Sequence, residues 1–455
     1  MLLKHYYVEK IAHSSYIVAG NENCAVVDPS RDVDLYIEEA EKMGVKITHI
    51  LETHLHADFL SGHIELAEKT GATMYFPKSG QAQFDHVALE EGDKFKLEDI
   101  EFEIIETPGH TPEHITYITR DLARSEDPIG IFCGDTLFVG DAGRPDLFPD
   151  RKEELAKKLY DSLFNKILKL PDFVEVYPAH GEGSLCGKAM GAKYRSTIGY
   201  ERKHNPVLQH KEIDEFVKNL TEGMPEVPDH FARCSALNAE GPLPIYKLPK
   251  LKKMKATDFF EKSQQNDTFV LDTRSYTGFG GQHVPKSYNI DFISNLPTFA
   301  GWVVPPDKKI LLVAEDKKRA EESALWLYRV GIDNIVGYID GSMKSWLVEG
   351  YETSNVPQIH PSIVEENINS SDFIILDGRD KKTYEENHVE KAVNIPSPDL
   401  RTRYDELDKN KNIIIYCNSG ARSSLGASIL KSKGFENVWN LGGGIKSYMA
   451  YKNDK

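Results

Sequence analysis

The second half of this 455-residue chain contains an internal repeat, and this feature limits the possible folds more than any other. The segment 373–380 (FIILDGRD) matches 268–275 (TFVLDTRS) at a shift of 105 residues. HVEKAVNIP and HVPKSYNID match at the same shift, and the stretch that begins IIIYCNSGARSS matches the one that begins ILLVAEDKKRAE at a shift of 103. Each copy alternates short apolar strands with helical stretches, as a parallel sheet covered by helices requires. The sequence therefore predicts one α/β unit of about 100 residues, present twice.

Two proline-containing stretches separate the parts of the chain. One is centred on GPLPIYKLPK, ahead of the first copy, and the other is NVPQIHPSIV, between the copies. A chain of 455 residues is also too long for one ordinary core. We predict four segments: a larger separate domain over 1–235, a linker over 236–253, the first copy over 254–355 and the second copy over 360–455.

The composition limits the classes of partner. The net charge of −16 at pH 7 argues against a nucleic acid or an anionic membrane as the main partner. No apolar run is long enough to cross a bilayer, and the first residues do not have the pattern of a secretory signal. The five cysteines are scattered rather than paired, which fits a reducing compartment, so we expect a cytoplasmic location. The sequence is also compatible with a homo-oligomer.

The two copies of the repeat differ at a cysteine. Cys417 follows the apolar run IIIY and precedes NSGARS and a helical pattern. A strand, a short loop and a helix N-terminus in this order can direct backbone N–H groups at the sulfur, and Arg422 adds positive charge, so the loop favours a thiolate. At the shift of 103 residues, Cys417 corresponds to Ala314, whereas Arg422 corresponds to Arg319. The first copy therefore has no thiol at this position.

Two other interpretations of Cys417 are open. A cysteine at a strand end can be a packing residue, since free cysteine is among the most buried residue types. A thiol loop can also bind phosphate, as in protein tyrosine phosphatases, but those loops need one more residue between the cysteine and the arginine. The shorter spacing between Cys417 and Arg422 predicts a smaller cup that suits one outer sulfur atom.

The second half resembles tandem rhodanese domains in which the C-terminal copy is active and the N-terminal copy is degenerate. The resemblance rests on CNSGARS, on LDGRD and on the pattern H-x-x-x-A-x-N-I-P, and it covers about 200 residues. It implies that Cys417 accepts a sulfane sulfur as a persulfide and passes it to a nucleophile, with Arg422 and Ser423 in the same catalytic loop.

In the first 235 residues, possible metal ligands follow four apolar runs. The runs ITHILET, FEIIET, IGIFCG and FVEVYPA precede, in order, His54 with His56 and Asp58, then His110, Asp135 and His180. Ligand-type residues in loops after successive strands converge at one edge of a sheet. Imidazoles and carboxylates together suit Zn²⁺ or non-haem Fe²⁺. Isolated histidines (His63, His86 and His114) are expected to be surface or capping residues rather than ligands.

These segments resemble the metallo-β-lactamase superfold, which implies an αββα sandwich. The whole chain is therefore predicted to be an α/β multidomain protein. Binuclear hydrolases of this fold, such as glyoxalase II, extend the first motif to H-x-H-x-D-H, but here the last position is Phe59. A phenyl ring offers no lone pair to a metal and disfavours a hydrated ion. A second metal site is therefore weakened, and one metal per chain is expected.

A site of His54, His110 and Asp135 has the two histidines and one carboxylate that non-haem Fe(II) oxygenases use. Within the superfold this set resembles the persulfide dioxygenases, and HADFLSGH and YPAHGEGS resemble bacterial members fused to rhodanese domains. The resemblance implies one Fe(II) per chain. It also assigns Arg144 to the site of a thiol co-substrate such as glutathione or coenzyme A.

Further residues are expected to support this site. His56, Asp58 and His180 are predicted to orient the ligands and bound water through hydrogen bonds. Cys186 either packs in the interior or faces the metal pocket, where it could hold or exchange a persulfide. The helix expected after it carries five basic residues: Lys188, Lys193, Arg195, Arg202 and Lys203. They form either a solvated face or an anchor for an anionic thiol carrier.

Together the two halves predict a persulfide dioxygenase, which converts R–S–SH and O₂ to R–SH and sulfite. It is fused to a sulfurtransferase that moves sulfur between a persulfide, Cys417 and sulfite or thiosulfate, in sulfide detoxification. Fusion raises the local concentration of the shared intermediate. The first copy is expected to act as a spacer or to shape an interface. Two alternatives remain: a binuclear zinc hydrolase of the glyoxalase II or lactonase kind, and a non-enzymatic carrier in which Cys417 only stores sulfur.

Overall fold

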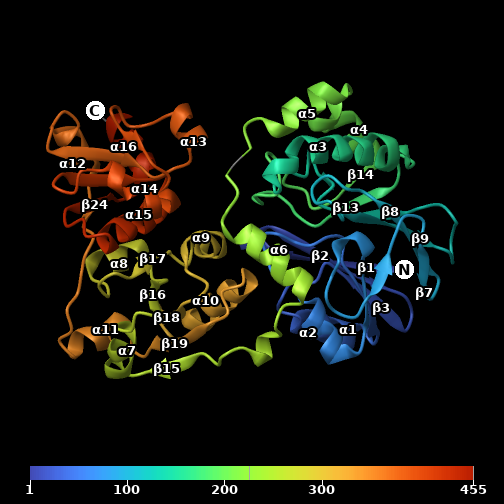
Figure 1. Cartoon of the computed structure of the whole chain (residues 1–455), viewed down its shortest axis with the longest axis horizontal. Coiled ribbons are helices and arrows are strands. Elements are labelled where there is room, and N and C mark those ends of the chain that lie inside the picture. Colours follow the sequence, from blue (N-terminus) through green and yellow to red (C-terminus); the bar gives the residue numbers. More distant parts are fainter. Residues whose placement is uncertain (225, 454–455) are drawn as a thin grey trace. The chain divides into compact units, whose positions relative to one another are not determined.

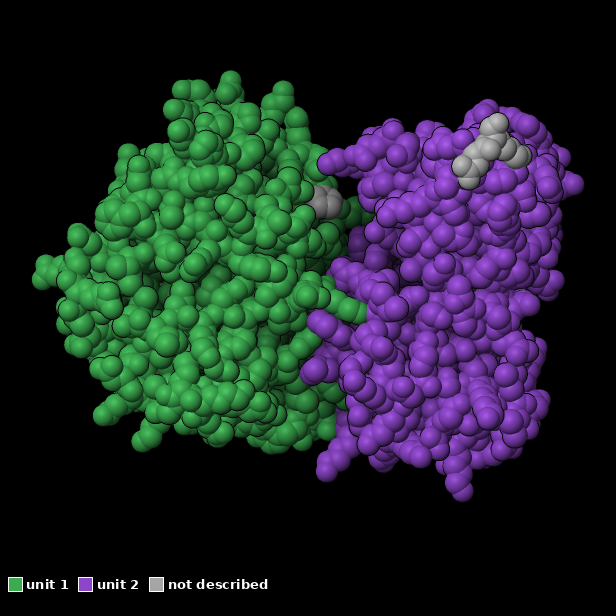
Figure 2. Space-filling model, turned by 180° about the vertical axis from the view of Figure 1, so that it is seen from behind, with its two compact units in different colours: residues 1–248, 328–331 green, residues 249–327, 332–455 purple. Residues whose placement is uncertain are grey.

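The computed structural model describes residues 1–224 and 226–453. It divides into two compact units, which are coloured separately in Figure 2. Unit 1 comprises residues 1–248 with 328–331, and unit 2 comprises the remaining described residues. Within the described ranges, no helix combines the length and the apolar character that crossing a membrane requires.

Unit 1 is built on two six-stranded sheets (Figure 1). The first sheet has the order β1-β2-β3-β4-β5-β6, with strands at Leu2–Val8, His13–Ala19, Asn23–Val27, Lys46–Leu51, Thr73–Pro77 and Val87–Leu89. The second has the order β14-β13-β10-β9-β8-β7, with β7 to β10 at Lys94–Leu97, Ile100–Glu106, Ile115–Asp121 and Gly130–Gly134, and β13 and β14 at Glu175–Pro178 and Ser196–Thr197. A short hairpin pairs β11 (Leu137–Phe138) with β12 (Asp141–Ala142).

The helices of unit 1 pack on the outer faces of the two sheets, except the last one, which packs beside Ala57 and Cys186. They are α1 (Asp34–Met43), α2 (His63–Thr70), α3 (Lys152–Asp161), α4 (Ile198–His204), α5 (Ile213–Thr221) and α6 (His230–Glu240). On β2, Tyr16 and Val18 point into the cluster between the sheets, whereas Ile17 packs with Tyr36 of α1. Both faces of this strand are apolar because both are covered. This layering confirms the predicted αββα sandwich.

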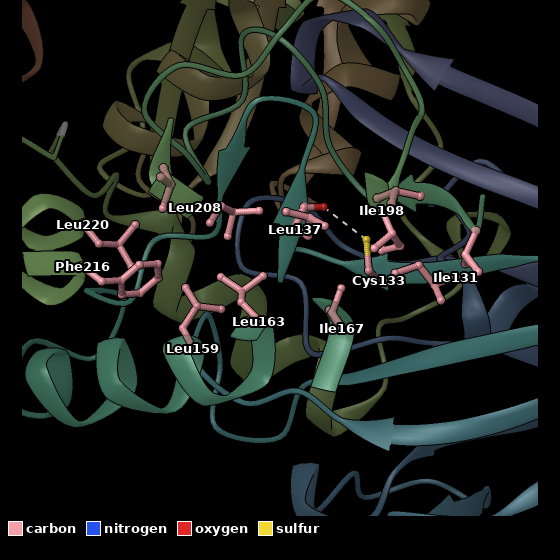
Figure 3. Packing of buried hydrophobic residues seen from close by; sticks show 14 of the residues in the cluster. Ile131, Cys133, Leu137, Leu159, Leu163, Ile167, Ile198, Leu208, Phe216 and Leu220 are labelled. Carbon is pink, nitrogen blue, oxygen red and sulfur yellow. Dashed lines mark hydrogen bonds between the residues drawn. The ribbon is translucent and has the colours of Figure 1, made fainter. Parts of the chain in front are cut away.

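The outer face of the second sheet packs on α3 and α5. Figure 3 shows Leu159 of α3 and Phe216 of α5 in the same buried cluster as Ile131 of β10. Cys133 also belongs to this cluster, and its Sγ donates to Leu137 O at 3.2 Å. Cys133 is therefore a packing residue, although it lies only two positions before Asp135.

Unit 2 contains two five-stranded parallel sheets with the same strand order. In the first copy the order is β15-β19-β18-β16-β17, with strands β15 to β19 at Lys252–Met254, Thr268–Asp272, Tyr288–Asn289, Lys309–Val313 and Ile335–Ile339. In the second copy the order is β20-β24-β23-β21-β22, with strands β20 to β24 at Gln358–Ile359, Phe373–Asp377, Val393–Asn394, Asn412–Tyr416 and Val438–Leu441. The identical order confirms the repeat.

Helices follow the strands in both copies. In the first copy they are α7 (Ala256–Ser263), α8 (Tyr276–Gly281), α9 (Leu296–Val303), α10 (Lys317–Arg329) and α11 (Ser342–Val348). In the second copy they are α12 (Pro361–Asn367), α13 (Lys381–Glu386), α14 (Leu400–Arg403), α15 (Ala421–Ser432) and α16 (Gly444–Asn453). One structural pair recurs: Arg274 and Arg379 each bind the aspartate two positions earlier through two nitrogens.

The segment predicted as the linker before the first copy is partly helical. Helix α6 runs across position 235 and ends at Glu240, inside the range 236–253 that was predicted to be a linker. Asn238 on this helix is buried because its amide bonds the loop at 56–61. The other domain boundaries stay predictions.

Candidate metal centre and thiol loop

Three side chains from three strand ends of unit 1 form a compact set of possible metal ligands. His54 follows β4, His110 follows β8 and Asp135 follows β10. One donor atom from each residue lies within 4.8 Å of the others, and all three residues are buried. The loops after these strands thus bring together the three residues that the sequence suggested as ligands.

The two imidazoles are oriented for metal binding. His54 Nδ1 lies 2.9 Å from Thr53 Oγ1, and His110 Nδ1 lies 2.9 Å from Arg144 O. Nε2 of each ring is buried and has no hydrogen-bond partner among the described residues. Burial lowers the pKa of both His54 and His110, so both rings are neutral at pH 7. A neutral imidazole with one nitrogen fixed and the other free is the form that binds a metal.

Asp135 completes this set. Its Oδ2 lies 3.3 Å from His110 Nε2 and 3.8 Å from His54 Nε2. Its backbone N donates to His114 Nε2 at 2.9 Å, so His114 positions this candidate ligand. Gly134 has a φ of +48°, and a Cβ there would lie 2.4 Å from His114 Nε2, so only glycine fits. The expectation that His114 is a surface or capping residue is therefore wrong.

His63 is also buried, contrary to the same expectation, because its Nδ1 lies 3.1 Å from Glu52 Oε1. Neither His63 nor His114 belongs to a possible ligand set among the described residues. The prediction that His63 and His114 are not metal ligands is consistent with this.

His180, in the loop after β13, bridges two carboxylates. Its Nδ1 lies 2.7 Å from Asp135 Oδ1, and its Nε2 lies 2.9 Å from Asp58 Oδ2. Burial by itself would lower the pKa of His180, but the charges of Asp135 and Asp58 outweigh it and raise the pKa to about 10. His180 is placed to orient the carboxylate of Asp135, a candidate metal ligand.

Cys186 joins Asp58 and His180 in a second buried set, with one donor atom from each within 4.8 Å of the others. The thiol comes close because the turn after His180 folds back: Arg144 N donates to Cys186 O at 2.9 Å. Burial raises the pKa of Cys186 well above its usual value, so the metal-free thiol is protonated. The motif spacing alone did not indicate that this thiol would lie beside Asp58.

Phe59 fills the space beside the second set. Its ring is fully buried and lies 4.5 Å from the His56 ring and 6.1 Å from the His180 ring, measured between centroids. The ring of His13, which the sequence analysis did not single out, lies 4.0 Å from that of Phe59. His13 is directly opposite His180 in an isolated antiparallel bridge, so both side chains lie on one face.

His56 turns toward a different pair of carboxylates. Its Nε2 lies 3.2 Å from Asp28 Oδ1 and 3.3 Å from Glu52 Oε2. Burial alone would lower the pKa of His56, but Asp28 and Glu52 outweigh it and raise the pKa well above its usual value. Asp28 also accepts from Thr53 N at 2.8 Å, which connects this charged group to the loop that carries His54.

Arg144 is engaged within the protein. Its Nε and Nη2 donate to the two carboxylate oxygens of Asp146 at 2.7 and 2.9 Å, and its Nη1 donates to Leu185 O at 2.9 Å. The side chain is fully buried. Since its carbonyl fixes His110 and its guanidinium holds the turn before Cys186, Arg144 ties the two ligand sets together. Its predicted contact with a thiol co-substrate stays a prediction.

The loop that carries His56 and Phe59 is held by helix α6. Asn238 Nδ2 donates to His56 O at 2.8 Å and to Phe59 O at 2.9 Å, and Asn238 Oδ1 accepts from Ser61 N at 2.9 Å. All polar atoms of this buried amide are therefore used by one loop. Nothing in the local sequence around Asn238 indicates this contact, because its partners lie about 180 residues away.

The basic residues after Cys186 do not lie on one helix. Helix α4 begins only at Ile198, so Lys188, Lys193 and Arg195 precede it. The predicted single helix is wrong because this segment is a turn fixed by Asp141, whose Oδ2 accepts from Lys188 N at 2.6 Å. Arg202 does lie on α4, but its Nη2 donates to Leu168 O at 2.6 Å and so serves the fold.

Lys193 and Arg195 line a cavity of about 570 Å³ on unit 1. The other lining residues are mostly aromatic: Leu3, His5, Tyr16, Tyr177 and Tyr194. A cavity of this volume is of the size that small ligands use, and the two cations favour an anion. These two residues are therefore a possible anchor for an anionic group.

In unit 2, Cys417 lies at the start of the loop between β23 and α15. Its Sγ accepts a hydrogen bond from Gly420 N at 3.2 Å and lies 3.3 Å from Ser423 Oγ. The backbone packs closely here: a Cβ at Gly444 would lie 2.3 Å from Cys417 O, so only glycine fits. The loop presents an N–H group and a hydroxyl to a buried sulfur, which agrees with the cup expected from CNSGARS.

The first copy contributes aromatic rings to this loop. The guanidinium carbon of Arg422 lies 5.2 Å from the ring centroid of Phe299 on α9. A Cβ at Gly420 would lie 3.0 Å from the ring of Tyr276 on α8. Arg422 also lies 3.6 Å from Asp380. The copy without a thiol thus shapes the surroundings of Cys417, which the sequence offered only as one of two expectations.

Two family models match the chain. The model described as the metallo-beta-lactamase superfamily matches residues 9–180. The model described as the rhodanese-like domain matches twice, at residues 255–349 and 360–451. The first match covers His54, His110 and Asp135, and the last one covers Cys417.

Individual relatives point to two activities. The hydroxyacylglutathione hydrolase of Pseudomonas entomophila is 31% identical over 219 residues, which cover 43% of this chain and 80% of the relative. The mitochondrial persulfide dioxygenase ETHE1 of Mus musculus is 29% identical over 226 residues, which cover 48% of this chain and 80% of the relative. These identities do not separate a hydrolase from a dioxygenase.

Among solved structures, the metallo-beta-lactamase from Staphylococcus aureus subsp. aureus COL is 31% identical, with a TM-score of 0.67. The match covers 74% of this chain and 98% of that chain. Because this share is larger than unit 1, the similarity continues into the repeat.

Proposed function

Because the chain belongs to the metallo-beta-lactamase superfamily and continues into two rhodanese-like domains, we propose that it is a persulfide dioxygenase fused to a sulfurtransferase. The first reaction is R–S–SH + O₂ + H₂O to R–SH, sulfite and two protons. The second is R–S–SH + sulfite to R–SH + thiosulfate. One observation supports the proposal most: the same chain holds two sites. One is a set of two histidines and one carboxylate whose Nε2 atoms have no hydrogen-bond partner among the described residues, and the other is a thiol that accepts a hydrogen bond from a loop N–H.

His54, His110 and Asp135 would hold one Fe(II), which supplies the redox chemistry between O₂ and the persulfide sulfur. Two imidazoles and one carboxylate leave coordination positions free. The protein keeps the two rings in the correct orientation through Thr53 and Arg144, and His180 holds a proton between Asp135 and Asp58. These contacts fix the donor atoms before a metal binds.

The persulfide is proposed to be carried by a small anionic thiol such as glutathione or coenzyme A. The cavity lined by Lys193 and Arg195 supports an anionic carrier, since it combines two cations with aromatic rings. Cys186 supports a second route, because its thiol lies beside Asp58 and His180 and could take the sulfur from the carrier.

In the second reaction, the Cys417 thiolate attacks the outer sulfur of R–S–SH. The Sγ–S bond forms, the carrier S–S bond breaks and R–S⁻ leaves. Sulfite then attacks the outer sulfur of the Cys417 persulfide, which releases thiosulfate and restores Cys417. Gly420 N stabilises negative charge on Sγ throughout, since a donated N–H favours an anion. No outside oxidant is needed in these transfers.

The proposal is tested with the full chain loaded anaerobically with Fe(II). O₂ uptake is followed in an oxygen electrode with glutathione persulfide and coenzyme A persulfide, and sulfite and thiosulfate are quantified. We expect O₂ uptake that depends on persulfide and on iron, with sulfite as the product. Absence of uptake with every persulfide tested, at full iron loading, would overturn the dioxygenase.

A second candidate is a binuclear zinc hydrolase. It is favoured by the second buried set of Asp58, His180 and Cys186, and by the hydroxyacylglutathione hydrolase among the relatives. His180 and Asp58 would then exchange their mutual contact for a metal ion. Zinc-loaded protein that binds two ions per chain and hydrolyses S-lactoylglutathione would favour this candidate over the first.

A further inference from the structure

A buried asparagine lies directly behind the thiol loop. Asn440, on β24, is fully buried. Its Nδ2 donates to Gly420 O and to Gln358 Oε1, both at 2.9 Å. These two acceptors fix the orientation of the amide, so Oδ1 faces Ser423 and accepts from its hydroxyl at 2.6 Å. Asn440 therefore touches both of the residues that bond the Cys417 sulfur, without touching the sulfur itself.

The hydroxyl of Ser423 has one proton and three nearby acceptors. Asn440 Oδ1 is at 2.6 Å, Gly420 O at 3.2 Å and Cys417 Sγ at 3.3 Å. While Cys417 is a thiol, its S–H can donate to Ser423 Oγ and the hydroxyl can donate to Asn440. Once the sulfur is an anion, the hydroxyl must turn to Sγ and give up Asn440, since one proton cannot serve both. Asn440 thus competes with the sulfur for this proton.

The repeat supplies a natural comparison. In the first copy, Ala314 takes the place of Cys417 and Ala320 takes the place of Ser423 at the shift of 103 residues. In the second copy, Asn440 pairs with Ile415 across the sheet. In the first copy, the counterpart of Ile415 is Leu312, and its strand partner is Tyr338, because this pairing contains a bulge. The amide is therefore missing in the copy that lacks the thiol and the hydroxyl.

Polar residues that serve the fold are kept in both copies. Asn394 Nδ2 donates to Asp377 O and Arg379 O, and Asn289 Nδ2 makes the same two bonds to Asp272 O and Arg274 O in the first copy. Loss of an amide is thus not general to the degenerate copy. The first copy therefore lacks a counterpart of Asn440 as well as of Cys417 and Ser423, although it keeps the fold.

We infer that Asn440 is a positioning residue for sulfur transfer at Cys417, and that it acts by sharing the Ser423 proton with the sulfur. The inference rests on the proposed sulfurtransferase function. In the step concerned, Cys417–SH and R–S–SH give Cys417–S–SH and R–SH: the Sγ–S bond forms, the carrier S–S bond breaks, and the thiol proton passes to the departing R–S⁻. Asn440 sets how strongly Ser423 holds the sulfur anion before this attack.

The test measures the rate of alkylation of Cys417 by iodoacetamide against pH, with the site read by peptide mass spectrometry in the full chain. In Asn440→Leu, the hydroxyl loses its nearest acceptor, so it donates more often to the sulfur, with Gly420 O as the remaining alternative acceptor. The midpoint of the pH profile should move down by about one pH unit, as expected for a strengthened bond to a charged acceptor. Thiosulfate formation above both midpoints should slow by about threefold, because a more stabilised thiolate is a weaker nucleophile.

A second variant tests the same idea in case Asn440→Leu does not fold. Asn440→Asp keeps the size of the side chain, accepts the Ser423 proton more strongly and adds negative charge near the sulfur. The midpoint should therefore move to higher pH, opposite to the leucine variant. As a control, Asn394→Leu removes a polar amide of the same domain that does not bond Ser423, and it should leave the midpoint in place.

The mechanism also predicts dependence on Ser423. In a Ser423→Ala background, Asn440→Leu should no longer move the midpoint, because no shared proton remains. A shift that persists without the hydroxyl, or shifts of the same direction for leucine and aspartate, would show that Asn440 acts only on structure. If all shifts occur but wild type forms no thiosulfate, the proposed function fails, and only the sharing of the Ser423 proton between Asn440 and the Cys417 sulfur stands.

Discussion

At the scale of single residues, Cys417 and His54 belong to different units, so their chemistry can be separated by substitution. Cys417→Ser removes the sulfur acceptor but leaves every metal ligand in place. We expect O₂ uptake with a persulfide to stay within about twofold of wild type, while thiosulfate formation from persulfide and sulfite is lost. An oxygen electrode and a thiosulfate assay on the same sample measure both. Loss of O₂ uptake as well would contradict independent sites.

The reverse substitution is His54→Ala. It removes one of the three donors, so we expect the iron content of the purified protein and the O₂ uptake both to fall by more than about tenfold. Sulfur transfer from a persulfide through Cys417 to sulfite should be unchanged. His63→Ala is the matched control, because His63 is also buried but belongs to no donor set among the described residues. Equal iron loss in both variants would argue against His54 as a ligand.

Sequence spacing identified the residues that meet at strand ends but not what each side chain touches. His54, His110 and Asp135 could be grouped because each follows an apolar strand, and strand ends converge. The contacts of Arg144 could not be predicted in this way, because Asp146 binds the guanidinium that a co-substrate would use. His56 likewise turns to Asp28 and Glu52, which carry no motif of their own.

At the scale of secondary-structure elements, helix α6 stabilises the metal loop. Asn238→Leu would leave His56 O, Phe59 O and Ser61 N without their partner. We expect the free energy of unfolding to fall by about 2–3 kcal/mol and iron affinity to fall about tenfold, since unpaired buried polar groups are costly and supporting contacts tune metal sites. Chemical denaturation and iron titration measure the two effects. Unchanged iron affinity would show that α6 does not support the candidate metal site.

Helix α9 gives a second prediction at this scale. Phe299→Ala removes the ring that lies against Arg422. We expect the KM for sulfite to rise about two- to fivefold with little change in kcat, as the loss of a partly exposed cation–π contact would produce. Phe292→Ala is the control, since Phe292 lies 4.0 Å from Arg319, the counterpart of Arg422 in the first copy. An equal effect of both substitutions would indicate general destabilisation.

The sequence predicted strands better than it predicted helices. Apolar strands with regular spacing were recognisable, and both sheets of the repeat agree with them. The helix predicted to carry all the basic residues after Cys186 begins only at Ile198, because Asp141 from a distant hairpin binds the backbone of the preceding turn. Helix α6 was not predicted for a related reason: its buried Asn238 is stabilised by a loop that is distant in the sequence.

At the scale of the whole molecule, the repeat fixed the number of domains, since a self-similar segment must fold into the same unit twice. What it could not reveal was that the first copy still contributes Phe299 and Tyr276 to the loop of the second. In the proposed function, sulfite is the product of unit 1 and a reactant of unit 2. We expect thiosulfate to form from persulfide and O₂ alone, without added sulfite, in the full chain, as mass spectrometry of the products would detect.

The most direct test of the central claim is a metal analysis of the full chain combined with O₂ uptake. The account predicts one iron per chain, bound through His54, His110 and Asp135, and one O₂ consumed for each persulfide oxidised to sulfite. Two zinc ions per chain, with thioester hydrolysis and no O₂ uptake at full metal loading, would contradict it.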